Sequence, residues 1–140
     1  MKKTILTLLA FITLLTSVAA IPANAAIADP GETVMPLWDN TLALNISIIF
    51  QDNGYGYAEG TIVGYTGVTQ IVVDVTVYQQ TGTNWSYVTD NQTTINGRGG
   101  AFSCPFPTVS GAYYKAEYTI TVTKNGVNEV IEKEKYAICE

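Results

Sequence analysis

Hydrophobic and polar residues alternate with a period of two along most of the chain beyond residue 40. In the clearest segment, 70–80, hydrophobic residues from Ile71 to Val77 occupy every second position and alternate with polar ones such as Asp74 and Thr76. This alternation predicts strands with one buried side and one solvent-facing side. Seven strands are expected, at residues 41–50, 55–63, 70–80, 85–88, 101–106, 112–123 and 127–139.

Turn residues separate these segments. Asn125-Gly126 is the strongest hairpin signal in the chain. The segment 96–100 has the sequence NGRGG and is expected to be the most flexible part. Short strands divided by glycine and asparagine turns favour an all-β antiparallel β-sandwich of about seven strands. A closed barrel is the alternative, because the number of strands alone does not distinguish the two.

The first 25 residues have the pattern of a secretory signal peptide. Lys2 and Lys3 precede a largely apolar stretch at 5–20, and Ala23-Asn24-Ala25 fits the small-x-small cleavage pattern. An uncleaved membrane anchor is the alternative, although polar residues interrupt the stretch and it ends at Pro22. We therefore expect a released extracellular protein with a signal peptide at 1–25, an extended arm at 26–40 and a sandwich domain at 41–140. Trp38 is expected to close one end of the sandwich.

The composition argues against several classes of function. The chain contains no histidine and carries a net charge of −5, so catalysis by a Ser-His or Cys-His pair is excluded and nucleic-acid binding is not expected. Phosphate-loop, nucleophile-elbow and zinc-binding motifs are missing from the sequence. We therefore predict no enzymatic activity, no metal and no cofactor.

The last expected strand is crowded with charges, in the sequence EVIEKEK at 129–135. Such density is typical of an exposed edge strand, where lysine and glutamate discourage pairing with other chains. A hydrolytic carboxylate pair at Glu132 and Glu134 is the alternative interpretation.

Cys104 and Cys139 are the only cysteines. Export would expose them to an oxidising compartment, where disulfides persist. Closing a loop of about 35 residues would stabilise the fold by roughly 4 kcal/mol. We predict a disulfide between them, with two free thiols as the alternative.

Aromatic residues are the most suggestive feature for binding. Trp85 and Tyr87 are two residues apart on one expected strand and so share a face, and Tyr78 and Tyr113 lie on faces that are otherwise polar. An exposed run of such rings is a candidate sugar-binding surface. The alternative is that Trp85 covers the core and that the tyrosines are ordinary strand residues of high β propensity.

Two segments carry a resemblance: MPLWDN at 35–40, and SGAYY at 110–114 followed by a threonine-rich strand, Asn125-Gly126 and a terminal cysteine. Together they resemble uncharacterised small secreted proteins of Firmicutes, with immunoglobulin-like or fibronectin-like β-sandwich modules. The resemblance implies an immunoglobulin-like fold in which Tyr114 is similar to a tyrosine corner. It departs from antibody domains in the positions of its cysteines, and it implies no activity.

These observations lead to a hypothesis of function. We expect a secreted, non-enzymatic β-sandwich that acts through its surface on a protein or glycan, with no membrane partner after signal cleavage. A secreted inhibitor or bacteriocin-like effector is the alternative. The sequence leaves the ligand and the oligomeric state open.

Overall fold

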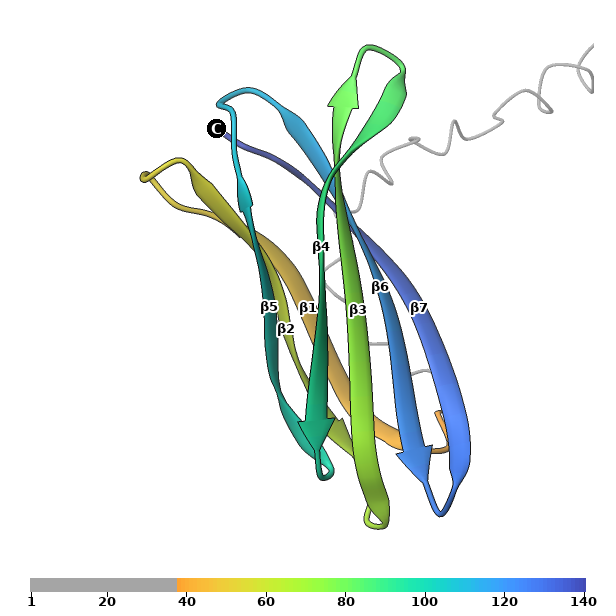
Figure 1. Ribbon diagram of the computed structural model, residues 1–140. Helices are drawn as coiled ribbons and strands as arrows, with labels where there is room; N and C mark the ends of the chain where they lie inside the picture. The colour runs from red at the N-terminus through yellow and green to blue at the C-terminus, as the bar shows by residue number, and fades with distance from the viewer. Residues whose placement is uncertain (1–37) are drawn as a thin grey trace, which may run out of the picture. The chain divides into compact units, whose positions relative to one another are not determined.

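Seven antiparallel strands form two sheets packed face to face in the computed structural model, which describes residues 38–140 (Figure 1). The strands are β1 (Thr41–Phe50), β2 (Tyr55–Gly64), β3 (Val68–Thr81), β4 (Asn84–Asn96), β5 (Gly99–Pro107), β6 (Tyr113–Lys124) and β7 (Val127–Ile138). The signal peptide expected at 1–25 and the arm residues 26–37 lie outside the described residues. No helix among residues 38–140 has the length and apolar character needed to cross a bilayer.

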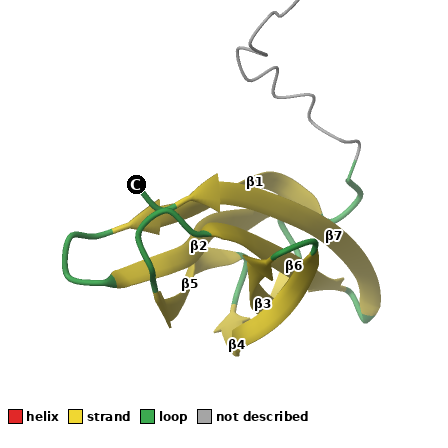
Figure 2. Ribbon diagram, turned by 90° about the horizontal axis from the view of Figure 1, so that it is seen from above, coloured by secondary structure: helices red, strands yellow, loops and turns green. Residues whose placement is uncertain are grey.

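The strand order identifies an immunoglobulin-like sandwich. One sheet has the order β1-β2-β5 and the other has the order β4-β3-β6-β7. The chain passes between the two layers at β2–β3, β4–β5 and β5–β6, and the layers are seen together from above in Figure 2. In immunoglobulin constant domains the fourth strand pairs beside the fifth, whereas here β4 pairs with β3 and so widens the second sheet. The predicted fold class is confirmed.

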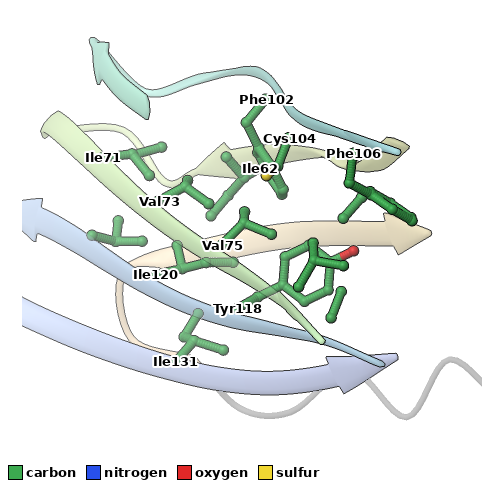
Figure 3. Packing of buried hydrophobic residues seen from close by; sticks show 14 of the residues in the cluster. Ile62, Ile71, Val73, Val75, Phe102, Cys104, Phe106, Tyr118, Ile120 and Ile131 are labelled. Atoms are coloured by element: carbon green, nitrogen blue, oxygen red, sulfur yellow. The ribbon is translucent and has the colours of Figure 1, made fainter. Parts of the chain in front are cut away.

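Alternating side chains from both sheets fill the space between them. Val73 and Val75 of β3 and Ile120 of β6 face Ile62 of β2 and Phe102 of β5, and all five are buried (Figure 3). The interior is thus one continuous hydrophobic cluster that joins the sheets. Burial of this apolar surface is the main stabilising contribution to such a fold.

Tyr114 at the start of β6 forms the expected corner. Its ring is fully buried, and the backbone N–H of Val109 donates a hydrogen bond of 2.9 Å to its hydroxyl oxygen. A tyrosine hydroxyl bonded to backbone a few residues upstream, at the crossing into this strand, defines the tyrosine corner of immunoglobulin-like folds. The bond fixes the β5–β6 connection over the end of the core.

The expected edge position of the last strand is also confirmed, since β7 ends the four-stranded sheet. Glu129, near the start of this edge strand, accepts hydrogen bonds from the segment that leads into β1. Its carboxylate accepts hydrogen bonds from the backbone N–H of Asp39 (2.6 Å) and of Asn40 (3.3 Å) and from the Thr41 hydroxyl (2.7 Å). Trp38, which precedes Asp39 in the chain, is partly buried and packs against the core. Glu129 thereby joins the edge strand of one sheet to the first strand of the other.

Three local expectations need correction. The alternation along 41–50 places Leu42 on the expected buried side, but it is 43% exposed, because the β1–β2 register shifts between Thr41 and Ala43 and interrupts the alternation. β4 runs on to Asn96, well beyond the expected end at residue 88. Gly99 and Gly100 belong to β5 and not to a flexible segment. A Cβ at Gly99 would lie 2.8 Å from the Ile62 carbonyl oxygen, so the glycine permits close pairing of the strands.

The predicted disulfide is absent, because Cys104 and Cys139 are both free and buried. Cys104 lies within β5, opposite Ala58 in the three-stranded sheet. Cys139 follows the last strand of the other sheet, where its backbone N–H donates to the carbonyl of Ala112 (2.9 Å). Cys104 thus belongs to one sheet, whereas Cys139 follows the edge strand of the other.

Candidate functional site

The solvent-facing side of the four-stranded sheet carries the candidate site. Strand pairing places Tyr87, Tyr78, Lys115 and Tyr136 in one row across β4, β3, β6 and β7. A neighbouring row contains Trp85 opposite Gln80, and Tyr113 opposite Ile138. The five rings of these rows are called the aromatic face: Tyr78, Trp85, Tyr87, Tyr113 and Tyr136.

A β-bulge sets the arrangement on β4. Tyr78 pairs with Tyr87 while the adjacent Val77 pairs with Thr89, so Val88 is the extra residue of the bulge. Residues on either side of such an insertion change their facing, and bulges of this kind commonly re-aim side chains near functional sites. As a result, Tyr87 and Asp90, three residues apart, share one face, and the Tyr87 hydroxyl donates a hydrogen bond to the Asp90 carboxylate.

The rings contact one another in two groups. Trp85 lies with its ring centroid 5.7 Å from that of Tyr113 and 5.8 Å from that of Tyr136, and the last two rings are 6.1 Å apart. Tyr78 and Tyr87 form an edge-to-face pair at 6.4 Å. These spacings are typical of favourable aromatic pairs. Tyr87 and Tyr136 remain 61% and 47% exposed, so the face presents aromatic surface to solvent.

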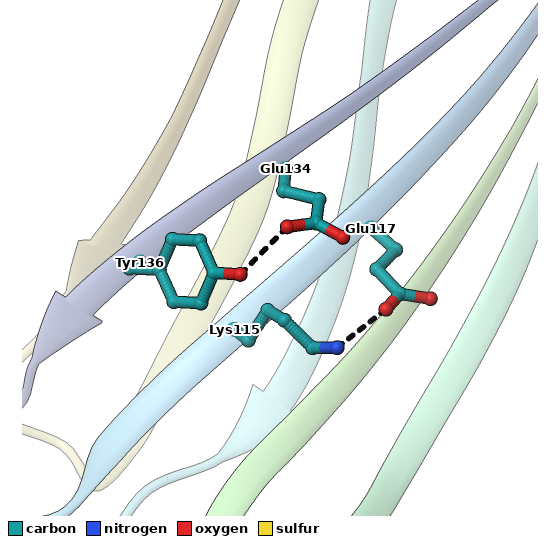
Figure 4. A network of polar contacts seen from close by, with 4 residues as sticks. All are labelled: Lys115, Glu117, Glu134 and Tyr136. Carbon is teal, nitrogen blue, oxygen red and sulfur yellow. Dashed lines mark hydrogen bonds and ion pairs between the residues drawn. The ribbon is translucent and has the colours of Figure 1, made fainter. Parts of the chain in front are cut away.

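Lys115 links the two groups. Its ammonium lies 4.7 Å from the ring centroid of Tyr78 and 5.4 Å from that of Trp85. The same nitrogen pairs with the Glu117 carboxylate at 2.5 Å (Figure 4), and this hydrogen bond raises the pKa of Lys115 above its ordinary value. A cation over aromatic rings is attracted to their electron-rich faces. Lys115 shares the outward face of the sheet with Tyr78 and Tyr136, the residues opposite it on β3 and β7.

Carboxylates border the aromatic face. The Tyr136 hydroxyl donates a hydrogen bond of 2.6 Å to Glu134 (Figure 4), and this bond raises the pKa of Tyr136. The bond to Asp90 raises the pKa of Tyr87 in the same way. Both hydroxyls thus stay protonated and are oriented toward the carboxylates. A shallow depression between β6 and β7 continues the surface beyond the rings, and it is lined by Glu117, Tyr118, Thr119, Glu132, Lys133 and Glu134.

The structure brings together all four aromatic residues singled out in the sequence: Tyr78, Trp85, Tyr87 and Tyr113. Sequence reasoning missed Tyr136, because the charged run before it dominated the interpretation of the last strand. Its position was nevertheless readable, since Tyr136 shares the alternation of Glu132 and Glu134, which face outward. The part of the chain that the structure describes holds no group of three side chains suited to a metal ion.

Comparisons with known proteins bear on the fold. No family model matches the chain, and no curated protein matches it in sequence. Solved structures with a similar backbone include a β-glucuronidase of Parabacteroides merdae, at 14% identity and a TM-score of 0.42 over 68% of this chain and 13% of that one. A protein of Arabidopsis thaliana is similar at 8% identity and a TM-score of 0.41, over 71% of this chain and 79% of that one.

A sporulation control protein of Bacillus subtilis is also similar, at 10% identity and a TM-score of 0.39, over 71% of this chain and 51% of that one. This chain therefore spans only a small part of the glucuronidase and about half of the sporulation protein. Identities this low concern the backbone fold alone, and TM-scores this low carry no argument about function.

Proposed function

We propose that the protein is a secreted, non-enzymatic carbohydrate-binding module that acts through its aromatic face. The observation that supports this most directly is the gathering of five aromatic rings from four strands on one solvent-facing side of a sheet. A soluble domain usually covers the outer face of such a sheet with polar side chains. A contiguous exposed aromatic patch is a mark of an interaction surface.

The chemistry of the face suits sugars. A pyranose ring has apolar C–H faces, which stack on aromatic rings, and hydroxyl edges, which need hydrogen-bond partners. Carboxylates at Asp90 and Glu134 stand beside the rings of Tyr87 and Tyr136, and carboxylate oxygens accept hydrogen bonds from hydroxyl groups. The open and weakly hollowed sheet fits the side of a polymer better than an enclosed small molecule.

Binding of the purified protein to an array of polysaccharide fragments tests the proposal. We expect retention on at least one glycan class and a loss of affinity of about tenfold in Trp85→Ala, equivalent to about 1.4 kcal/mol. Tyr55→Ala is the matched control, because Tyr55 is 50% exposed but begins β2 in the other sheet. Failure to bind any glycan, or equal losses in the two variants, would contradict the proposal.

A further inference from the structure

The solvent-facing side of the four-stranded sheet carries more negative than positive charges. By the strand register, the outward positions of β3, β4, β6 and β7 carry a single ammonium, that of Lys115, among five carboxylates. The carboxylates are Asp74, Asp90, Glu117, Glu132 and Glu134. This side of the molecule is therefore complementary to a cationic ligand.

The carboxylates nearest the rings are placed unfavourably for the isolated protein. Glu117 and Glu134 are directly opposite each other on β6 and β7, and like charges at opposed positions destabilise a sheet. Lys115 pairs with Glu117 alone, and within residues 38–140 that is the sole ion pair. Glu134 has only the Tyr136 hydroxyl as its partner. An added cation beside Glu134 would relieve the repulsion.

The protein already shows how an ammonium lies on this face. Lys115 holds its nitrogen over the rings of Tyr78 and Trp85 while bonding a carboxylate. Glu134 and the ring of Tyr136 offer the same combination of carboxylate and aromatic ring, and within residues 38–140 no ammonium forms an ion pair with Glu134, although Lys115 is nearby (Figure 4). The second combination therefore fits a ligand ammonium, held by charge and by the ring face.

The short separation between carboxylate and ring favours a particular ligand chemistry. The Tyr136 hydroxyl contacts Glu134 at 2.6 Å, so a group stacked on this ring must carry its charge within a few ångströms of its apolar face. An amino sugar does so, because its nitrogen is attached directly to the ring carbon. A lysine side chain instead carries its ammonium at the end of a flexible four-carbon stem.

We propose that the ligand of the aromatic face is an amine-bearing polysaccharide, a polymer of glucosamine with free amino groups. In this complex sugar rings stack on Trp85 and Tyr136, and an ammonium binds Glu134 and the adjoining Glu117. The inference rests on the proposed carbohydrate-binding function and specifies its substrate class.

Calorimetric titration of the protein with a glucosamine hexamer, and with the N-acetylated hexamer of the same linkage, tests this inference. The two ligands share their backbone and differ in charge at nitrogen. We expect tighter binding of the free amine, weakened by added salt. Glu117→Gln and Glu134→Gln should each weaken amine binding by roughly two- to fivefold, the range for exposed ion pairs. Binding of the N-acetylated hexamer should weaken less, because the amide oxygen of glutamine still accepts a hydrogen bond from a sugar hydroxyl.

Glu59→Gln is the matched control, because Glu59 faces outward from the other sheet, opposite Ser47 and Ser103. Equal or tighter binding of the N-acetylated hexamer, lost in Trp85→Ala, would overturn this inference and leave the proposed function standing. Tighter binding of poly-lysine than of the glucosamine hexamer would overturn it in favour of a basic peptide. Binding of neither hexamer would also overturn it, and the array of polysaccharides would then decide the broader function separately.

Discussion

Tyrosine hydroxyls have different hydrogen-bond partners in the core and on the surface of this sandwich. The buried hydroxyl of Tyr118 donates to the Ser47 carbonyl at 2.9 Å and thereby joins β6 to β1 of the opposite sheet. On the aromatic face, the hydroxyls of Tyr87 and Tyr136 donate to carboxylates instead. The same side chain thus serves as a cross-sheet tie in the core and as an oriented polar group at the surface.

Tyr118 should make the protein less stable as the pH rises into the alkaline range. Burial raises the pKa of Tyr118 above its ordinary value of 10.0. Above about pH 10 the unfolded chain therefore loses this proton while the folded protein keeps it, so the free energy of unfolding falls as pH rises. The stabilisation is complete below that pH. Tyr118→Phe should reduce the steepness of the fall, by at most about 1.4 kcal/mol per pH unit.

Urea unfolding of both proteins at a series of pH values checks this expectation. Cys104, whose pKa is also raised by burial, is present in both and cancels in the comparison. At neutral pH the variant should lose about 1 kcal/mol for the missing hydrogen bond. Identical alkaline slopes for the two proteins would show that Tyr118 ionises equally in both states.

Among the strands, regular alternation of hydrophobic and polar residues predicted most of the elements. It failed at positions where the pairing of two strands is irregular. The buried valines of β3 and the Asn125-Gly126 turn, with φ of 52° and 77°, are as the sequence implied. Bulges are different, because one inserted residue reverses the facing of those around it. That is why the exposure of Leu42 and the meeting of Tyr87 with Asp90 could not be predicted from alternation alone.

Glu129 shows that the sequence pattern also fails to predict the partners of a charged residue. In the sequence it is one of several charges on an edge strand, and nothing there indicates that its carboxylate reaches the start of β1. Partners 88 to 90 residues away in the chain supply its three hydrogen bonds. Only the meeting of two sheet edges, which the sequence does not specify, gives this glutamate a structural role.

Removal of that carboxylate should loosen the junction between the sheets. Glu129→Gln replaces one acceptor oxygen by an amide nitrogen, which cannot accept the Thr41 hydroxyl proton. We expect a loss of about 1–3 kcal/mol in the free energy of unfolding, as for hydrogen bonds to charged groups. Glu132→Gln, an exposed change on the same strand, should stay within about 0.5 kcal/mol of the original protein. Equal unfolding midpoints in urea for the two variants would contradict the role of Glu129.

The two sheets formed by residues 38–140 are held together by one core that they share, without a covalent link between them. The expected disulfide rested on the pairing of two exported cysteines, and sequence could not show that they lie in different layers. Cys104 is buried in mid-strand, and Cys139 follows the last strand at the chain end. These positions predict different access to a thiol reagent, because chain ends open locally at lower free energy than core strands do.

We therefore expect two phases when the native protein reacts with an aromatic disulfide reagent under non-denaturing conditions. Cys139 should react first, through fraying of the end, while Cys104 should react at the rate of global unfolding, because burial also raises its pKa and disfavours the reactive thiolate. Cys139→Ser should remove the fast phase, and Cys104→Ser the slow one. In urea both thiols should react at once, and a reductant should leave the unfolding midpoint unchanged. A protein with no titratable thiol in urea would instead contain the disulfide, and the two layers would then have to approach each other at Cys104 and Cys139.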